Sequence, residues 1–229
     1  MKRAMQFVFK FLLIGFITKI AGEAIHEIIG HGLLVLLFGG TITGLQIAIL
    51  WPYELSYISF SPPSIGFEPW QAALIDGGGI LISLIVTCVI QAFLLTGKLT
   101  WPISTSLFWL AFWTFINPAG YLIMGGMGPF GDILNLVNKG VIIKEGALIS
   151  GVFLFLVDLF SLSAILERDL AQFQIVERPD KALVIFWLIV PLMTIASLMS
   201  SRQSFIYLLL SFVPVLFIYA YVTLRKKKS

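Results

Sequence analysis

The sequence contains little charge, one cysteine and only two histidines. Of its 229 residues, 12% are charged and 59% are hydrophobic. Soluble domains carry roughly 25% charged residues, so this balance excludes an ordinary soluble domain and a disordered chain. The lone Cys88 cannot form an intramolecular disulfide, which excludes a disulfide-stapled secreted domain.

Long apolar stretches dominate what remains. A helix that crosses the roughly 30 Å hydrocarbon layer needs about 20 apolar residues. Six stretches fit: residues 5–38, 77–96, 102–116 (with an extension to 124), 147–166, 182–199 and 204–224. The sequence therefore predicts an all-α polytopic membrane protein of about six transmembrane helices, folded as a single domain over residues 1–229 and surrounded by the lipid bilayer.

Basic residues lie at both ends of the chain, at Lys2 and Arg3 and again over residues 225–228. An even number of spans places both termini on one side, and excess Lys and Arg marks that side as cytoplasmic. No aromatic or polar partners surround the basic tail, so we expect no nucleic-acid binding. No small-residue cleavage site follows the first apolar stretch, so it is not predicted to be a cleaved signal peptide.

The first stretch, residues 5–38, is too long for one straight crossing. We expect one long, bent or partly interfacial helix, with a helix-loop-helix as the alternative. Residues 41–60 have a different pattern, in which apolar side chains such as Leu45, Ile47 and Ile49 occupy alternate positions. That period predicts a membrane-associated β segment after the first helix.

A polar cluster interrupts the first helix. Glu23, His26, Glu27 and His31 lie within nine residues, and both histidines of the protein are among them. Each ionisable side chain inside a span costs at least about 2.5 kcal/mol on insertion scales, so such a cluster is expected to serve a function. The simpler alternative is a pair of buried histidines that hydrogen-bond to the two glutamates.

The cluster resembles the zinc-binding motif of zinc hydrolases, with one extra residue between the histidines. Zinc hydrolases use neutral imidazoles as ligands and a nearby glutamate as general base. In the usual H-E-x-x-H motif the histidines are four residues apart on one helical face. Here they are five apart, which on an ideal α-helix separates the imidazoles by about 140°. A π-bulge would bring them together, and Gly30 is the residue most tolerant of that distortion.

In this motif and in several later ones, the sequence resembles the site-2 protease family of intramembrane zinc metalloproteases. The resemblance covers residues 7–138, a metalloprotease-like core, and leaves the additional spans of residues 147–224 unmatched. It rests on the zinc-motif run of residues 25–33, the Gly-rich exit at 38–40, the β segment, Asp76 with the glycines at 77–79, Asn117-Pro118 and Gly131-Asp132.

The resemblance implies a zinc-dependent endopeptidase that cleaves membrane-spanning peptides or proteins. His26 and His31 would bind Zn²⁺, Glu27 would activate water, and Asp132 would complete the protein ligands. Asp76 is the rival third ligand, although it is equally well explained as a helix N-cap.

Further polar residues have supporting roles in this hypothesis. Glu23 is expected to accept a hydrogen bond that orients His26, and Asn117 with Pro118 is expected to break a span where it lines a polar cavity. Asp158 needs a partner, for which a helix–helix hydrogen bond is the simplest choice. The alternative functions are a catalytically inactive protease-like scaffold and a proton or metal transporter.

Overall fold

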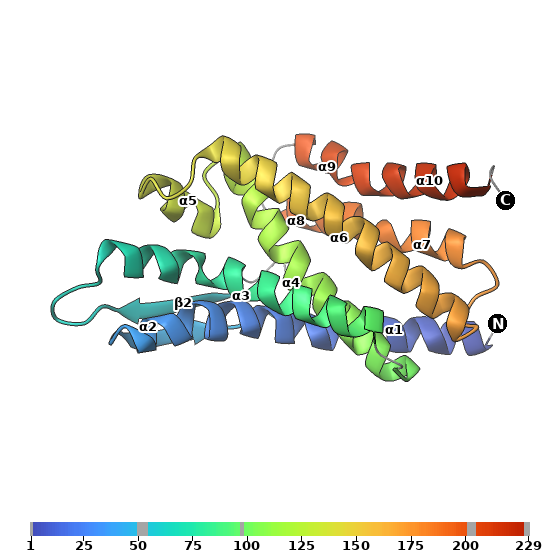
Figure 1. Ribbon diagram of the computed structural model, residues 1–229, viewed down its shortest axis with the longest axis horizontal. Helices are drawn as coiled ribbons and strands as arrows, with labels where there is room; N and C mark the ends of the chain where they lie inside the picture. The colour runs from blue at the N-terminus through green and yellow to red at the C-terminus, as the bar shows by residue number, and fades with distance from the viewer. Residues whose placement is uncertain (1, 50–54, 97–98, 201–204, 227–229) are drawn as a thin grey trace.

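The computed structural model describes residues 2–49, 55–96, 99–200 and 205–226, and it is helical apart from one small sheet (Figure 1). In chain order the elements are α1 (Lys2–Ala24), the π-helix η1 (Ile25–Gly32), α2 (Leu33–Leu37), β1 (Thr41–Gln46), β2 (Tyr57–Ser61), α3 (Pro69–Thr96), α4 (Trp101–Met127), α5 (Gly131–Asn138), α6 (Lys144–Gln172), α7 (Pro179–Trp187), α8 (Ile189–Ser200), α9 (Phe205–Ser211) and α10 (Val213–Lys226).

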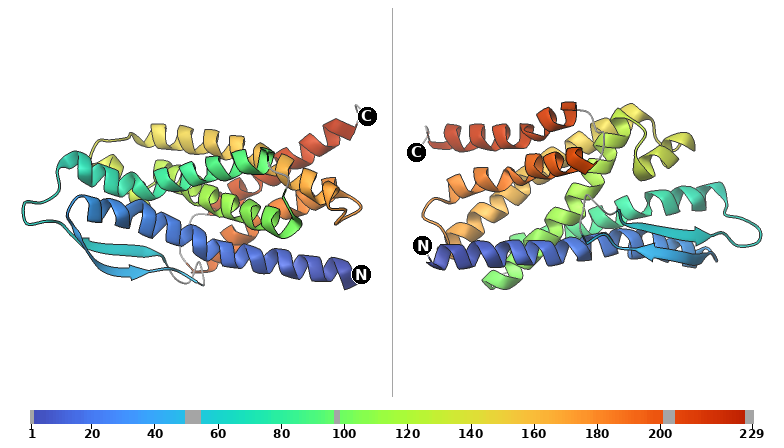
Figure 2. Two further views of the ribbon diagram at one scale, coloured as in Figure 1. Left: turned by 60° about the horizontal axis from the view of Figure 1, so that its bottom comes forward. Right: turned by 180° about the vertical axis from the view of Figure 1, so that it is seen from behind.

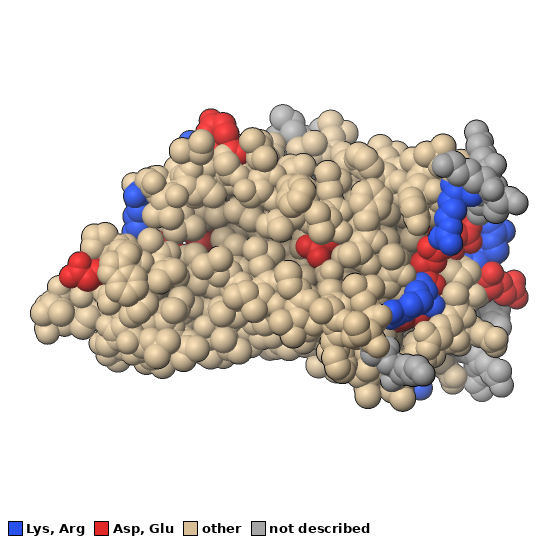
Figure 3. Space-filling model, viewed as in Figure 1, with Lys and Arg blue, Asp and Glu red and all other residues tan. Residues whose placement is uncertain are grey.

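Five helical segments of the described chain are long and apolar enough to cross a membrane. They are α3, α4, α6, residues 179–196 and residues 208–225. Charged side chains gather at the two ends of the molecule, and the broad band between them shows few (Figure 3). The prediction of a multi-pass membrane protein is therefore confirmed. The count of six is not confirmed, because the histidine-bearing first helix is not among these five segments.

The first helix is continuous from Lys2 to Leu37, with η1 in its middle. It forms a single long rod in two different views (Figures 1 and 2), so the expected long helix is confirmed and the helix-loop-helix is wrong. The described ends of α1 and α10 lie at the same end of the molecule (Figure 1). Which compartment that end faces stays a prediction, and residues 227–229 of the basic tail lie outside the described residues.

The predicted β segment forms two strands rather than one. β1 and β2 pair antiparallel, from Thr41 opposite Ser61 to Gln46 opposite Tyr57, with a register shift between Ile42 and Gly44. Of the alternating apolar positions, Leu45 lies in β1, whereas Ile47 and Ile49 follow the end of that strand. Residues 50–54 of the predicted segment lie outside the described residues. The hairpin runs alongside the first helix (Figure 2).

Helix α4 crosses the centre of the molecule and packs against α1, α3 and α6. Small residues permit close crossings: a Cβ on Gly151 of α6 would lie 2.8 Å from the backbone nitrogen of Ile123. Contrary to expectation, α4 is not broken at Asn117-Pro118, since the helix runs on to Met127. Apolar surroundings favour retaining the helix because each exposed backbone group would lack a partner there.

Helix α3 begins at Pro69, well before the expected start at Gly77. Gly77, Gly78 and Gly79 therefore lie inside a helix and do not form a turn. For the same reason Asp76 is not at a helix N-terminus, and its predicted alternative role as an N-cap is wrong.

Candidate metal centre

Three side chains from distant parts of the chain converge on one point. The His26 Nε2 lies 3.2 Å from Asp132 Oδ2 and 3.3 Å from His31 Nε2, and the His31 Nε2 lies 3.4 Å from Asp132 Oδ2. Ligands about 2.05 Å from a tetrahedral zinc ion are about 3.3 Å apart. The triangle of donor atoms therefore has the dimensions of one face of a zinc tetrahedron, and the group can hold a metal ion.

The π-helix brings the two histidines to the same side. Residues Ile25–Gly32 adopt π geometry, in which hydrogen bonds connect residues five apart and a residue five positions on lies one turn above. This confirms the expected departure from α-helical geometry between His26 and His31. Both imidazoles are buried, at 1% and 6% exposure.

The far nitrogen of each imidazole is held by a group of α3. His31 Nδ1 lies 2.6 Å from the backbone oxygen of Ile75, and His26 Nδ1 lies 3.4 Å from the Ser83 hydroxyl. Because the Ile75 carbonyl can only accept, it fixes the hydrogen of His31 on Nδ1. The Nε2 lone pair is then free for a metal, the arrangement in which a histidine ligand is oriented by its other nitrogen.

Glycines allow α3 to approach this closely. A Cβ on Gly79 would lie 2.4 Å from His26 Nε2 and 2.5 Å from His31 Nε2. A Cβ on Gly30 would lie 2.4 Å from the Cα of Gly79. The glycine run of α3 therefore has a packing role: it gives the imidazoles room and lets two backbones touch.

Asp132 reaches the site from the first turn of α5. It follows Gly131, whose φ of +48° favours glycine. Ile133 and Leu136 of the same short helix are buried against Ile80 and Leu122. Although burial raises the pKa of the Asp132 carboxyl, the two neighbouring imidazoles outweigh it and lower the pKa to about 2. The carboxylate is therefore ionised at neutral pH, as a metal ligand must be.

Glu27 lies next to the group without joining it. Its side chain is 5% exposed and within electrostatic range of both histidines and Asp132. Among the described residues it has no hydrogen-bond partner, so its carboxylate is free to accept a proton from a molecule in the site. A buried carboxylate without a partner is costly, which makes this arrangement unusual for a purely structural residue.

The other predicted site residues lie elsewhere. Glu23 does not orient His26; it lies 3.6 Å from the Lys19 ammonium, and Ser83 takes the expected place. Asp76 forms an ion pair with Lys139 and lies outside the donor triangle. Asn117 lines a cavity, but the cavity is mostly apolar, contrary to expectation, and the helix is unbroken there.

Asp158 has the helix–helix partner that the sequence predicts, since Gln91 donates to its carboxylate from α3. Sequence reasoning missed four groups around the histidines. Ser83 and the Ile75 carbonyl hold the imidazoles, Gly79 makes room for them, and the Tyr121 ring stacks on His26 with centroids 5.5 Å apart. A serine or tyrosine in an apolar span carries no motif, so only the helix packing reveals them.

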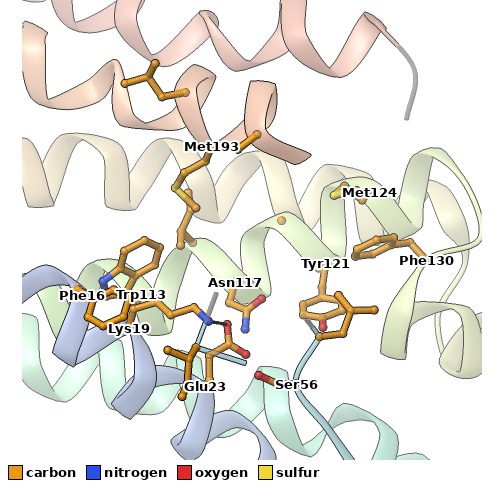
Figure 4. A pocket seen from close by; sticks show the side chains of 16 residues that line it. Phe16, Lys19, Glu23, Ser56, Trp113, Asn117, Tyr121, Met124, Phe130 and Met193 are labelled. Carbon is orange, nitrogen blue, oxygen red and sulfur yellow. Dashed lines mark ion pairs between the residues drawn. The ribbon is translucent and has the colours of Figure 1, made fainter. Parts of the chain in front are cut away.

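A cavity of about 520 Å³ lies between residues of α1, α4 and α8, next to Tyr121 (Figure 4). Lys19 and Glu23 of α1 and Asn117 and Tyr121 of α4 face it, and Met193 of α8 reaches it from the opposite side. Tyr121 is shared between the cavity and the donor group, because its ring stacks on His26.

Comparison with known proteins adds no relative: no family model, curated protein or solved structure matches the chain. The site geometry is therefore the basis for any functional assignment.

Proposed function

We propose that the protein is an intramembrane zinc-dependent protease that hydrolyses peptide bonds of membrane-spanning substrates. One observation carries the proposal: His26, His31 and Asp132 present three donor atoms 3.2–3.4 Å apart. The buried Glu27, which has no hydrogen-bond partner among the described residues, lies beside them. This combination of three protein ligands and a free base is the arrangement of zinc hydrolases. In this proposal the histidine helix is a sixth span.

The donor set fits zinc. Two imidazoles and one carboxylate suit a borderline metal, whereas magnesium and calcium favour oxygen-only sites. A catalytic zinc takes three protein ligands and keeps the fourth position for water or substrate. When bound, zinc polarises a carbonyl and lowers the pKa of a coordinated water to about 7.

The residues of the chain supply the remaining chemistry. Glu27 takes the proton of the attacking water and returns it to the nitrogen of the leaving amine, so no net proton remains on the carboxylate. The Ile75 carbonyl keeps His31 in the tautomer that binds metal through Nε2. Burial of the two imidazoles and Glu27 lowers the local dielectric constant and strengthens these electrostatic interactions.

The position of the β hairpin favours a peptide as the substrate. Its Ile58 and Ile42 side chains lie next to Gly32, at the end of the π-helix that carries the ligands. A helical substrate must be unwound before cleavage, and pairing with an exposed strand would satisfy its freed backbone groups. In the described chain β1 and β2 pair only with each other, so each has an edge that is not paired with a strand.

The test combines metal content with cleavage. Purified protein in detergent should contain close to one zinc per chain and cleave a single-span model substrate in proteoliposomes. Glu27→Gln should keep the zinc and lose cleavage by about 10²–10⁴-fold, because an amide cannot accept the proton. Retained cleavage in this variant would exclude Glu27 as the base.

Two other outcomes would replace the proposal. Zinc uptake into proteoliposomes without cleavage of any peptide would make the protein a transporter. Wild-type protein without stoichiometric zinc and without cleavage would make it an inactive scaffold.

A further inference from the structure

The cavity beside Tyr121 is mostly apolar, although polar residues such as Ser56 and Asn117 also line it. Its walls include Phe16 of α1, Trp113 and Met124 of α4, and Leu192 and Met193 of α8. Its volume of about 520 Å³ falls within the roughly 300–1,000 Å³ of typical ligand pockets. The cavity is therefore large enough for one or two bulky side chains and apolar enough to favour them.

The charges in the cavity cancel. Lys19 and Glu23 are the charged residues of its wall, and they form an ion pair at 3.6 Å. The Lys19 ammonium also donates to the backbone oxygen of Ala48 at 2.6 Å, so it is already occupied. Burying an unpaired charge is costly, and neither partner is available to neutralise one. The cavity therefore selects a neutral group over a charged one.

Tyr121 connects the cavity to the metal group, and none of His26, Glu27, His31 and Asp132 lines the cavity itself. Tyr121 lines the cavity and stacks on His26 with an interplanar angle of 10°. Glu23 lines the cavity one helical turn before Glu27. A substrate side chain in the cavity would therefore pack against Tyr121, the residue that contacts the His26 ligand.

Gly120 keeps this space open. It lies inside α4, where glycine costs about 1 kcal/mol relative to alanine. A Cβ built on it would meet no atom within 4 Å, so close helix packing does not require the glycine. Gly120 lines the cavity, and a larger side chain at this position would project into the free volume.

We propose that the cavity receives a bulky, uncharged apolar side chain of the substrate next to the scissile bond, and that Gly120 sets the size limit. This inference rests on the proposed proteolytic function, because it specifies which substrates that site accepts. Gly120 is a specificity-determining residue here, and it makes no contact with the metal group.

The experiment varies the substrate side chain and the residue at position 120. A model single-span substrate carries Ala, Leu or Phe at each position flanking its cleavage site. One missing methylene in an apolar pocket lowers kcat/KM by roughly 10-fold or more, so the wild type should prefer Leu or Phe over Ala by at least about tenfold. Gly120→Leu should abolish or reverse that preference, with Gly120→Ala in between.

Two controls separate a filled cavity from a damaged protein. Gly128→Leu is the matched substitution, because a Cβ on Gly128 also meets nothing within 4 Å and Gly128 does not line the cavity; it should keep the wild-type preference. All variants should retain wild-type zinc content. Equal loss of cleavage for all three substrates in Gly120→Leu, with normal zinc, would overturn the size-limit role.

A binding measurement distinguishes this proposal from the proteolytic function. Fluorescently labelled Ala, Leu and Phe peptides are titrated onto Glu27→Gln protein, with and without Gly120→Leu. Tighter binding of the larger peptides, lost on Gly120→Leu, supports the cavity assignment even if the wild type cleaves nothing. Cleavage without any dependence on side-chain size overturns the cavity assignment and leaves the protease intact. Co-purified lipid that Gly120→Leu releases, together with size-independent peptide binding, identifies an acyl chain as the occupant and also overturns it.

Discussion

The Nδ1 atom of His31 lies 2.6 Å from the backbone oxygen of Ile75. The next residue along α3, Asp76, forms an ion pair with Lys139, just beyond the helix that carries Asp132. Two consecutive residues of α3 therefore hold two different parts of the donor group. The sequence motif around Asp76 resembles that of a metal ligand. In the structure Asp76 instead forms an ion pair at the end of α5, the helix that carries Asp132.

Removal of each aspartate tests which one binds the metal. Asp132→Ala should reduce zinc occupancy from near one per chain to a small fraction, because it removes one vertex of the donor triangle. Asp158→Ala should leave occupancy unchanged, since Asp158 pairs with Gln91. Metal analysis of the purified variants measures both. Loss of zinc in Asp158→Ala with retention in Asp132→Ala would refute the donor triangle.

The ion pair itself has a smaller predicted effect. Asp76→Asn should weaken zinc affinity by about two- to fivefold, because partly exposed ion pairs contribute at most about 1 kcal/mol and this one acts only by positioning α5. The exchanged pair, Asp76→Lys with Lys139→Asp, should restore most of the affinity. Competition with a chelator measures it. A loss as complete as that of Asp132→Ala would instead make Asp76 a ligand.

The glycines of α3 allow a matched comparison. Gly79→Ala places a Cβ 2.4–2.5 Å from both Nε2 atoms and should abolish or strongly weaken zinc binding. Gly77→Ala gains the same helix propensity, and its Cβ meets Leu136 at an ordinary 3.8 Å. It should therefore bind zinc as the wild type does. If both variants bind zinc normally, the approach of α3 to the imidazoles is looser than the structure shows.

The π-helix has its own test. Deletion of Ile29, a residue with an exposed side chain, would return the histidines to a four-residue spacing on a regular α-helix. The shortened variant should still bind zinc, because a spacing of four also places both imidazoles on one face. His31→Ala in the shortened chain should remove that binding. Loss of zinc in the shortened chain itself would mean that the site requires π geometry.

The sequence by itself determined the membrane class, the helical content and the histidine helix. Apolar stretches of about 20 residues have few alternatives to a transmembrane helix, and two histidines five apart must share a face if they bind one metal. If both histidines bind one metal, their five-residue spacing requires a π-bulge, and Gly30 beside His31 tolerates that distortion. These are local properties, so neighbouring residues suffice to predict them.

Only the tertiary structure decided how the site is completed. The family resemblance favours Asp132 over Asp76 as the third ligand, but Asp132 lies 106 residues from His26. Only the packing places Asp132 beside the histidines and Asp76 beside Lys139. The roles of Ile75 and Ser83 depend on which face of α3 meets the π-helix, and that contact depends on glycines that leave room for it. The open space at Gly120 is enclosed by residues of α1, α4 and α8, which are distant in the sequence. These contacts arise from packing between segments that are distant in the sequence, so a pattern of neighbouring residues cannot predict them.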